Sequence, residues 1–294
     1  MGKTELINEL FSEKFEVISA DALQVYRRLD IGTAKPTMRE RREVPHHLID
    51  IRDPSEGFNV GDFVREAESC MRDIRSRGRI PLISGGTAFY LIRFLYGLPE
   101  TPPSDPDVRR ELEHRLDDEG ASRLFEELAA VDPASSRSIH QNDTYRILRA
   151  LEVYYISGRP LSDFRVPSRP RFSPEPLVLG LYREREELYR RIDDRVERMW
   201  DAGLAEEVRG LIDAGFGADD PGMKGIGYRE FFRMRKLGEW TLSDVRGEIK
   251  RSSRRYAKRQ LTFFRKLEET KWVHPADTGK IRNSLDRYVN TLNM

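Results

Sequence analysis

The sequence is poor in the features that mark secreted and membrane proteins. Cys70 is its only cysteine, so no disulfide can form within the chain, and we expect a reducing, cytoplasmic location. It has neither an apolar run long enough to span a bilayer nor an apolar signal-peptide core. Leu6 stands where a myristoylation motif would have Ser or Thr. We therefore expect a monomer with no membrane partner.

Charge is abundant but unevenly distributed. Of the 294 residues 34% are charged, and the formal net charge is only +1. Residues 229–266 nevertheless contain thirteen Lys and Arg against four acidic residues, a local balance of +9. A localised basic region on a nearly neutral protein favours a phosphate-rich partner. The alternative is a solvated helix face, which is the usual origin of a charge run.

The first hundred residues alternate between strand and helix patterns. Strands are predicted at 15–19, at the end of 44–51 and, as a buried strand, at 80–84. Helices are predicted at 4–12, 60–77 and 88–96. Strands that alternate with helices indicate an α/β fold with a parallel sheet.

Two proline-rich stretches, 99–106 and 160–176, enclose a region of different character. Helical patterns cover 108–116, 121–130 and 144–157, with no clear strand between them. A return strand is predicted at 177–181, and the rest is mainly helical. We therefore predict an α/β core, residues 1–100 and 173–294, with a helical insertion at 101–172.

The tripeptide Gly2-Lys3-Thr4, directly before a predicted helix, matches the second half of a phosphate-binding loop. In such loops backbone amides hold phosphate, the lysine neutralises it, and the hydroxyl binds Mg²⁺. The glycine and strand that should precede the tripeptide are missing, so we expect a chain that lacks the first half of its P-loop. The alternative is a chance tripeptide at a frayed end.

Asp21 directly follows the strand at 15–19, where parallel α/β sheets bind ligands. Thr87 follows Gly85-Gly86 at another strand-to-helix turn, where it caps the helix or meets a ligand. Arg229, after Gly225-Ile226-Gly227-Tyr228, is suited to clamping a phosphate, or is simply exposed. For His46 and His47, structural hydrogen bonding is favoured over a metal site, because neighbours in an extended segment point oppositely.

The segment 246–266 predicts a helix with two faces. Its basic face includes Arg254, Arg255 and Lys258, and an apolar seam consists of Ile249, Tyr256 and Phe263. A basic stripe on a docked helix suits a nucleic-acid backbone. Arg146 and Arg149 form a smaller version, beside a Tyr145 that stacks on a base or packs.

Taken together, these motifs resemble the tRNA dimethylallyltransferases, also called tRNA isopentenyltransferases. The markers run along nearly the whole chain and comprise Ile18–Tyr26, Asp30–Pro36, Val44–Asp50, Gly85–Thr87, Arg149–Val153, Gly225–Arg229 and Tyr256–Thr262. The resemblance implies a P-loop α/β core, a helical insertion that grips the tRNA anticodon stem-loop, and Mg²⁺-dependent transfer from dimethylallyl diphosphate to the N6 amine of an adenosine beside the anticodon.

The resemblance also implies roles for individual residues. Asp21 resembles the general base, Thr4 a catalytic Mg²⁺ ligand, and Arg229 a catalytic clamp. The implied diphosphate site comprises Gly2, Lys3, Thr4 and Arg229. The residues matched or proposed to contact tRNA are Asp21, Ala22, Leu23, Gln24, Thr87, Arg109, Tyr145, Arg146, Ile147, Leu148, Arg149, Arg254, Arg255 and Lys258.

Three other functions share parts of this pattern. A small-molecule P-loop kinase would share Gly2-Lys3-Thr4 and Asp21 but has no use for the basic helix. A prenyltransferase of free adenine nucleotides would not need the helical insertion. A tRNA-binding protein that is inactive for want of a complete P-loop would bind tRNA with strong salt dependence and transfer nothing.

Overall fold

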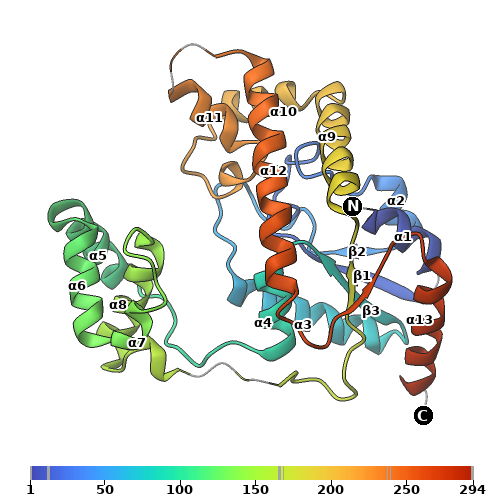
Figure 1. The fold of residues 1–294 in the computed structure, drawn as a ribbon, viewed down its shortest axis with the longest axis horizontal. Helices are drawn as coiled ribbons and strands as arrows, with labels where there is room; N and C mark the ends of the chain where they lie inside the picture. Colours follow the sequence, from blue (N-terminus) through green and yellow to red (C-terminus); the bar gives the residue numbers. More distant parts are fainter. Residues whose placement is uncertain are drawn as a thin grey trace. The chain divides into compact units, whose positions relative to one another are not determined.

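The computed structural model describes residues 2–11, 14–164, 167, 169–236, 238 and 240–292, without the side chains of Thr4 and Lys236. The chain divides into two compact units. The core unit consists of Met1–Leu95 and Phe172–Met294, and the helical unit is Tyr96–Arg171. The core unit combines a small parallel sheet with many helices (Figure 1), so the predicted α/β class is confirmed.

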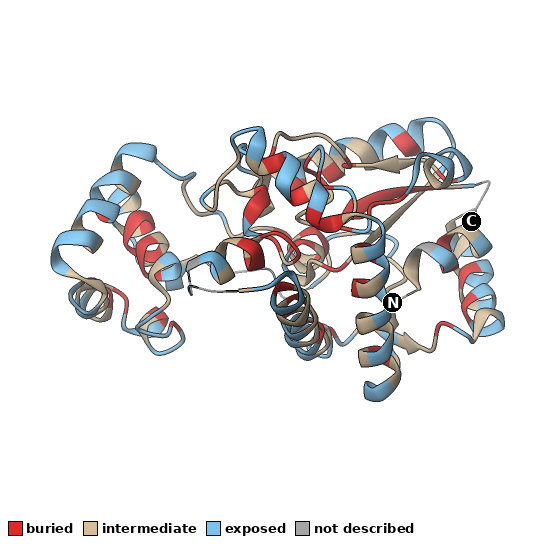
Figure 2. Ribbon diagram, turned by 90° about the horizontal axis from the view of Figure 1, so that it is seen from above, coloured by how far each residue is buried: buried red, intermediate tan, exposed pale blue. Residues whose placement is uncertain are grey.

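The main sheet has three parallel strands in the order β2-β1-β3. They are β1 (Phe15–Ala20), β2 (His46–His47) and β3 (Ile80–Gly85). Ile18 of β1 pairs with His47 on one side and Ile83 on the other. The central strand β1 is buried along most of its length (Figure 2), whereas β3 is half-buried throughout. The prediction of a buried strand at 80–84 was wrong about burial, because β3 lies at the sheet edge.

The second strand lies earlier than the sequence indicated. Pairing with β1 occurs at His46–His47, and the predicted strand at the end of 44–51 is absent. Leu48 and Asp50 have φ values of 61° and 59°. This left-handed backbone cannot continue an extended strand.

A second, two-stranded parallel sheet pairs β4 (Leu179–Leu181) with β5 (Lys271–Val273). The strand predicted at 177–181 therefore exists in part, but its partner was missed. Three residues are too short for β5 to show a periodicity.

The helices that begin in the core unit are α1 (Lys3–Leu10), α2 (Met38–Glu43), α3 (Val60–Ser76), α4 (Ala88–Tyr96), α9 (Arg185–Asp201), α10 (Leu204–Asp213), α11 (Arg229–Lys236), α12 (Leu242–Phe264) and α13 (Thr278–Leu292). The helix predicted at 4–12 ends at Leu10, and residue 12 lies outside the described part. In α3 the buried stripe includes Phe63, Ala67 and Ile74, as the helical spacing predicted.

The helical unit consists of α5 (Pro106–Glu119), α6 (Ala121–Val131), α7 (Pro133–Ser136) and α8 (Thr144–Ser157). Asp105 caps the first helix through the amides of Asp107 and Val108. Helices α5, α6 and α8 pack together around a core that includes Leu112, Leu128 and Leu151. Short 3₁₀ turns lie at Leu161–Asp163 and, in the core unit, at Gly222–Lys224.

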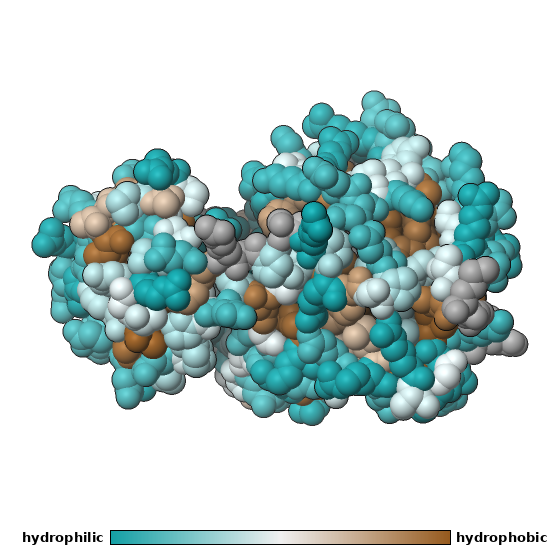
Figure 3. Space-filling model, turned by 90° about the horizontal axis from the view of Figure 1, so that it is seen from below, coloured by the Kyte–Doolittle hydropathy of each residue, from teal (hydrophilic) through white to brown (hydrophobic). Residues whose placement is uncertain are grey.

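Hydrophilic side chains cover most of the face shown in Figure 3, and the hydrophobic ones form separate small groups. Among the described helices, none is both long and apolar enough to cross a membrane.

Candidate active site

Asp21 lies immediately after the central strand, and the turn that follows holds its carboxylate in place. Its Oδ1 accepts hydrogen bonds from the backbone amides of Leu23 (3.0 Å) and Gln24 (3.4 Å). Because Ala20 pairs with Gly85, the turns after β1 and β3 lie side by side. The Ala22 amide donates to Oγ1 of Thr87 at 3.0 Å. The structure therefore brings Asp21 and Thr87 together at the edge where the two parallel strands end.

Helix α12 closes onto this turn through polar side chains. The Tyr256 hydroxyl donates to the Gly86 carbonyl oxygen at 3.2 Å, and the Gln260 amide donates to the same oxygen. A Cβ at position 86 would lie 2.6 Å from Nε2 of Gln260, so a larger residue there would displace the Gln260 side chain. Burial and, secondarily, the charge of Asp21 raise the pKa of Tyr256. The sequence placed Tyr256 in an apolar seam, and Gln260 entered only as part of the Tyr256–Thr262 marker, without a role of its own.

Lys3 reaches the same place from the first helix. Its Nζ lies 3.6 Å from where a Cβ on Gly86 would stand. Desolvation by the surrounding protein lowers the pKa of Lys3. The negative charge of Asp21 raises it in part, and the positive charge of Arg195 lowers it further. Nζ has no ion pair or hydrogen bond among the described residues. Gly2 precedes the helix in a left-handed conformation, and the Thr4 side chain lies outside the described part.

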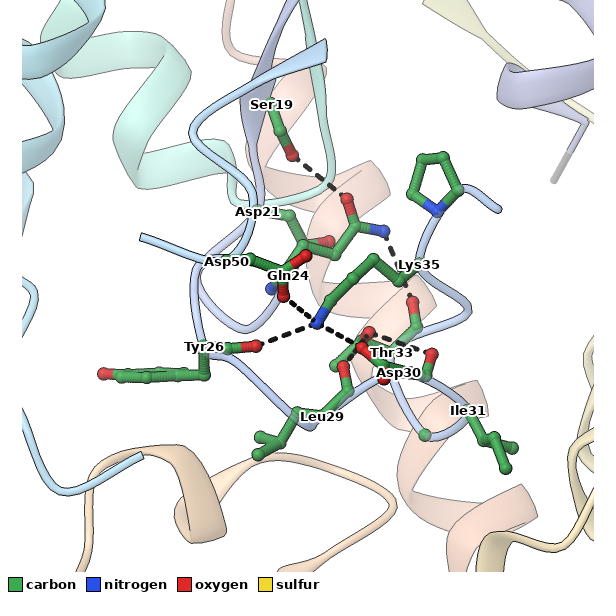
Figure 4. A network of polar contacts seen from close by, with 12 residues as sticks. Ser19, Asp21, Gln24, Tyr26, Leu29, Asp30, Ile31, Thr33, Lys35 and Asp50 are labelled. Atoms are coloured by element: carbon green, nitrogen blue, oxygen red, sulfur yellow. Dashed lines mark hydrogen bonds and ion pairs between the residues drawn. The ribbon is translucent and has the colours of Figure 1, made fainter. Parts of the chain in front are cut away.

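Gln24 connects the end of β1 with the loop at 30–36 (Figure 4). Ser19 donates to its Oε1 at 3.0 Å, and its Nε2 donates to the carbonyl oxygen of Thr33 at 3.4 Å. The position of the side-chain amide is therefore fixed at both ends. Nε2 also donates to the carbonyl oxygen of Ala34 at 3.5 Å, so both of its hydrogens have acceptors within the loop.

Lys35 holds the same loop from inside. Its side chain is 2% exposed, and Nζ lies 2.6 Å from a carboxylate oxygen of both Asp30 and Asp50. Nζ also donates to the Tyr26 carbonyl oxygen at 2.9 Å. Burial alone would raise the pKa of Asp50, but hydrogen bonds from Lys35 and Arg41 lower it. All hydrogens of this ammonium group are used within the protein (Figure 4), so it is a structural lysine.

Glu207 on α10 anchors the loop from outside, and the sequence gave no signal for it. Its carboxylate accepts from the backbone amides of Asp30 (3.0 Å), Ile31 (2.7 Å) and Gly32 (3.1 Å) and from the Tyr228 hydroxyl (2.7 Å). The Tyr228 ring packs where a Cβ on residue 32 would lie, so Gly32 is required there. Burial, then the charge of Glu207, raises the pKa of Tyr228.

Arg229 begins α11 one residue after Tyr228. Its Nε donates to the buried carboxylate of Glu230 at 3.1 Å. Within the described residues it has no hydrogen bond or ion pair with Asp21 or Lys3. Leu23 packs against Gly225, which places the glycine motif before Arg229 beside the turn after β1.

The basic face of α12 differs from the prediction. Arg254 is half-buried, lies 3.6 Å from an oxygen of Asp193 on α9 and stacks over Tyr189. Arg255 and Lys258 are exposed. The predicted apolar seam was right for Ile249, which is buried, and wrong for Tyr256 and Phe263, which are exposed. Besides Ile249, the helix buries Val245, Ser252, Ala257 and Gln260.

In the helical unit, Tyr145 is 69% exposed and the Arg109 guanidinium lies 5.2 Å from its ring centre. Arg146 is exposed and pairs with Asp143. Ile147 and Leu148 are buried in the core of the unit, which corrects their assignment as ligand contacts, because their side chains are already packed.

Arg149 points inward to a buried acid. Its guanidinium donates to Glu152 at 2.8 Å and to the Pro102 carbonyl oxygen at 2.7 Å. Glu152 also accepts from the amide of Asp105 at 3.1 Å. The pair therefore fixes the entry to α5, and no motif had predicted this use of Glu152.

The two histidines have structural partners. His46 Nδ1 lies 2.7 Å from the Val44 carbonyl oxygen, and His47 Nε2 lies 2.7 Å from the Glu16 carboxylate. Their interpretation as hydrogen-bonding residues is confirmed.

The sequence matches the IPP transferase family over residues 24–267. It is 47% identical to the tRNA dimethylallyltransferase of Geobacter metallireducens over 277 residues, which cover 92% of this chain and 88% of the relative. It is 45% identical to that of Geobacter sulfurreducens over 285 residues, covering 95% and 91%.

Solved structures agree. The tRNA isopentenylpyrophosphate transferase of Bacillus halodurans has a TM-score of 0.68 at 36% identity, covering 100% of this chain and 96% of that one. A eukaryotic dimethylallyltransferase acting on tRNA has a TM-score of 0.80 at 27% identity, covering 98% and 74%. The chain therefore belongs to the IPP transferase family.

Proposed function

We propose that this protein transfers the dimethylallyl group of dimethylallyl diphosphate to the N6 amine of an adenosine next to the anticodon of tRNA. The observation that carries the proposal is the convergence of Asp21 and Lys3 beside the Gly86-Thr87 turn. One group accepts a proton and the other neutralises phosphate. The relatives that share this family are named as tRNA dimethylallyltransferases.

The reaction needs catalysis at two places, the leaving group and the nucleophile. The bond between the allylic carbon and the diphosphate oxygen breaks, and its electron pair stays on the diphosphate. The adenine nitrogen bonds to the same carbon and loses a proton. Charge stabilisation at the leaving group and a base at the nucleophile therefore both lower the barrier.

Asp21 is suited to the role of base. Backbone amides engage only its Oδ1, and no described residue donates a hydrogen bond to Oδ2. Oδ2 can therefore take the proton that leaves N6, while the two amides hold the carboxylate in place. Gln24, three residues further along, connects this turn to the loop at 30–36 through hydrogen bonds to the carbonyl oxygens of Thr33 and Ala34.

The diphosphate is assigned to Gly2-Lys3-Thr4, which matches the second half of a P-loop motif, and to Arg229. Lys3 supplies an unpaired ammonium group at the start of α1, where helix amides face an anion. Arg229 contributes the second charge in this assignment, held at the start of α11 by Glu230.

Mg²⁺ fits the chemistry of the donors. In phosphate-transfer sites it usually binds one or two protein oxygens plus phosphate oxygens and waters. Thr4 is assigned as the principal ligand, and the Thr87 hydroxyl is a further oxygen donor at the described site. When bound, the ion would neutralise part of the charge on the diphosphate.

The tRNA surface is assigned to both units. Residues 101–172 are proposed to contact the anticodon stem-loop through Arg109, Tyr145, Arg146 and Arg149. RNA recognition commonly uses aromatic rings that stack on unpaired bases, and Tyr145 is exposed for this. In the core unit, Asp21 to Gln24 and Thr87 surround the flipped adenosine, and Arg255 and Lys258 face the phosphate backbone.

The test is transfer of label from dimethylallyl diphosphate to unmodified tRNA in the presence of Mg²⁺. We expect transfer by the wild type and a loss of at least about 10³-fold in Asp21→Asn, with tRNA affinity kept. The matched control is Asp53→Asn, a partly exposed carboxylate that caps its own turn through Ser55.

The other functions predict different results in the same assay. Label on AMP rather than tRNA indicates a nucleotide prenyltransferase. ATP turnover without tRNA indicates a kinase. Binding of tRNA without transfer, even at saturating donor, indicates a binding protein and overturns the proposal.

A further inference from the structure

Glu207 on α10 holds a loop of the candidate active site by its backbone. Its Oε2 accepts hydrogen bonds from the amides of Asp30 and Ile31, and its Oε1 accepts from the amide of Gly32. Glu207 is half-buried and has no ion pair among the described residues. Successive amides that converge on one anion form a nest, which other proteins use to bind phosphate. Here the anion belongs to the protein, so the loop keeps its shape without a ligand.

The same carboxylate joins the loop to the core of the unit. Oε1 of Glu207 also accepts from the Tyr228 hydroxyl at 2.7 Å. The Tyr228 ring is fully buried in the core and packs against the backbone of Gly32. Glu207 therefore fixes the loop against a segment that is itself immobilised by packing.

Hydrogen bonds lead from this loop to Asp21. The carbonyl oxygens of Thr33 and Ala34 accept from Nε2 of Gln24 at 3.4 Å and 3.5 Å. The backbone amide of Gln24 donates to Oδ1 of Asp21 at 3.4 Å. Gln24 thus contacts the loop through its side chain and the proposed base through its amide. A displaced loop would therefore shift the turn that holds the Asp21 carboxylate.

Arg195 depends on the same part of the loop. Its Nη2 donates to the carbonyl oxygen of Thr33 at 3.1 Å, and its charge interacts with that of Asp21. Thr33 therefore orients a second side chain that acts on the proposed base. Lys35 supports the loop from inside through the Asp30 side chain, whereas Glu207 holds the backbone amides directly before Thr33.

We propose that Glu207 is a positioning residue for the transfer reaction, and that it keeps Asp21 in place through the loop at 30–36 and Gln24. Its carboxylate contacts neither substrate and moves no proton. Its contribution is geometric, because a base that is displaced from the adenine amine takes the proton less effectively. The inference rests on the proposed function, in which Asp21 is the base.

Glu207→Gln tests the proposal, because a side-chain amide would turn a donor towards backbone amides that need an acceptor. In the label-transfer assay we expect kcat to fall about 10- to 100-fold, with KM for tRNA and for dimethylallyl diphosphate unchanged. In an Asp21→Asn background the same change should lower the rate less than about twofold, since the positioned group is gone. A merely structural role would lower both rates by the same factor. The matched control is Glu206→Gln, an exposed carboxylate on the same helix.

Hydrogen exchange gives a readout that does not need the reaction. In Glu207→Gln the amides of Leu23 and Gln24, which donate to Asp21, should exchange at least about tenfold faster than in the wild type. The amide of Ile18 in β1 should keep its rate, because the sheet does not depend on Glu207.

Tyr228→Phe decides the matter if Glu207→Gln does not fold. It removes one of the four hydrogen bonds to Glu207 and keeps the ring that packs on Gly32. Both kcat and the exchange at the turn should change in the same direction as in Glu207→Gln, by about threefold.

Three outcomes would overturn the proposal. They are unchanged exchange at Leu23 and Gln24, equally faster exchange in β1, and an equal loss of rate with and without the Asp21 carboxylate. A wild type that transfers no label, with faster exchange confined to the turn in Glu207→Gln, would instead count against the proposed function. The positioning of Asp21 by Glu207 would then still be supported.

Discussion

Two lysines of the core unit, Lys35 and Lys3, extend into the protein, and the groups that surround their ammonium nitrogens differ. Lys35 has two carboxylates at 2.6 Å and a carbonyl oxygen at 2.9 Å. Lys3 has no ion pair among the described residues and shares the charge of Asp21 with Arg195. An ammonium charge that is paired with carboxylates of the protein stabilises the fold. An ammonium charge without an ion pair is available to bind a ligand.

The largest expected effect is at the unsatisfied lysine. Lys3→Met should lower kcat/KM for dimethylallyl diphosphate by about 10²- to 10³-fold, because one charge that stabilises the leaving group is lost. The free energy of unfolding should stay the same or rise, since a desolvated charge disappears. Steady-state kinetics and urea unfolding measure the two quantities. A drop in stability with unchanged kinetics would reverse the roles of the two lysines.

At the satisfied lysine the expected effect is on stability. Lys35→Met should lower the free energy of unfolding by about 3 kcal/mol, because Asp30 and Asp50 lose the cation between them. The control is Arg39→Met, whose partner is Glu43 on the same exposed turn, with an expected change below about 0.5 kcal/mol. Equal changes in the two variants would show that the pairing of Lys35 contributes little.

Glu16 extends the comparison to an acid that is satisfied internally. Its side chain is 2% exposed, and hydrogen bonds from Arg77 and His47 lower its pKa from 4.5 to about 2. Because the pKa of Glu16 is lower in the folded protein, the ionised carboxylate stabilises the fold at any pH above the ordinary pKa of 4.5. This contribution is lost as the pH falls from 4.5 towards 2. Because the arginines are half-exposed, we expect about 2 kcal/mol rather than the full shift.

Urea unfolding between pH 2 and pH 7 measures this contribution. Glu16→Gln should remove this part of the acid dependence. An identical pH profile in the wild type and the variant would show that Glu16 is not stabilised as proposed.

The smallest expected effect compares two neighbours on α12. Arg255 is exposed, whereas Arg254 is tied to Asp193 and Tyr189. Arg255→Ala should reduce the slope of log K against log salt for tRNA by about 1, and Arg254→Ala should change it less. If both variants had the same slope, the pairing of Arg254 with Asp193 would not prevent that arginine from binding tRNA.

Local signals accounted for most of the elements. Helix α3 followed from its apolar stripe, and α5 was predicted from its helical pattern at 108–116 although it extends from Pro106 to Glu119. The second strand was misplaced because left-handed backbone at Leu48 and Asp50 leaves no trace in hydrophobic periodicity. Strand β5 was too short to be recognised from periodicity. The burial of β3 could not be predicted because it depends on the position of the strand in the sheet.

The residues of the candidate site also fall into a group that the sequence could predict and a group that it could not. Asp21 and Thr87 could be predicted, because each directly follows a strand and parallel strands end at a common edge. Arg195 and Glu207 could not, since each lies on a helix whose own pattern requires only a polar residue. Their importance comes from the loop or turn that they meet, more than 160 residues away in the case of Arg195.

The sequence by itself determined the α/β class, the family resemblance and the residue types that the chemistry needs. These depend on local spacing and on short motifs that fold in one way. Only the tertiary structure decided which charges are satisfied. Lys3 and Lys35 look alike in the chain, and whether carboxylates surround an ammonium group depends on segments that meet through folding.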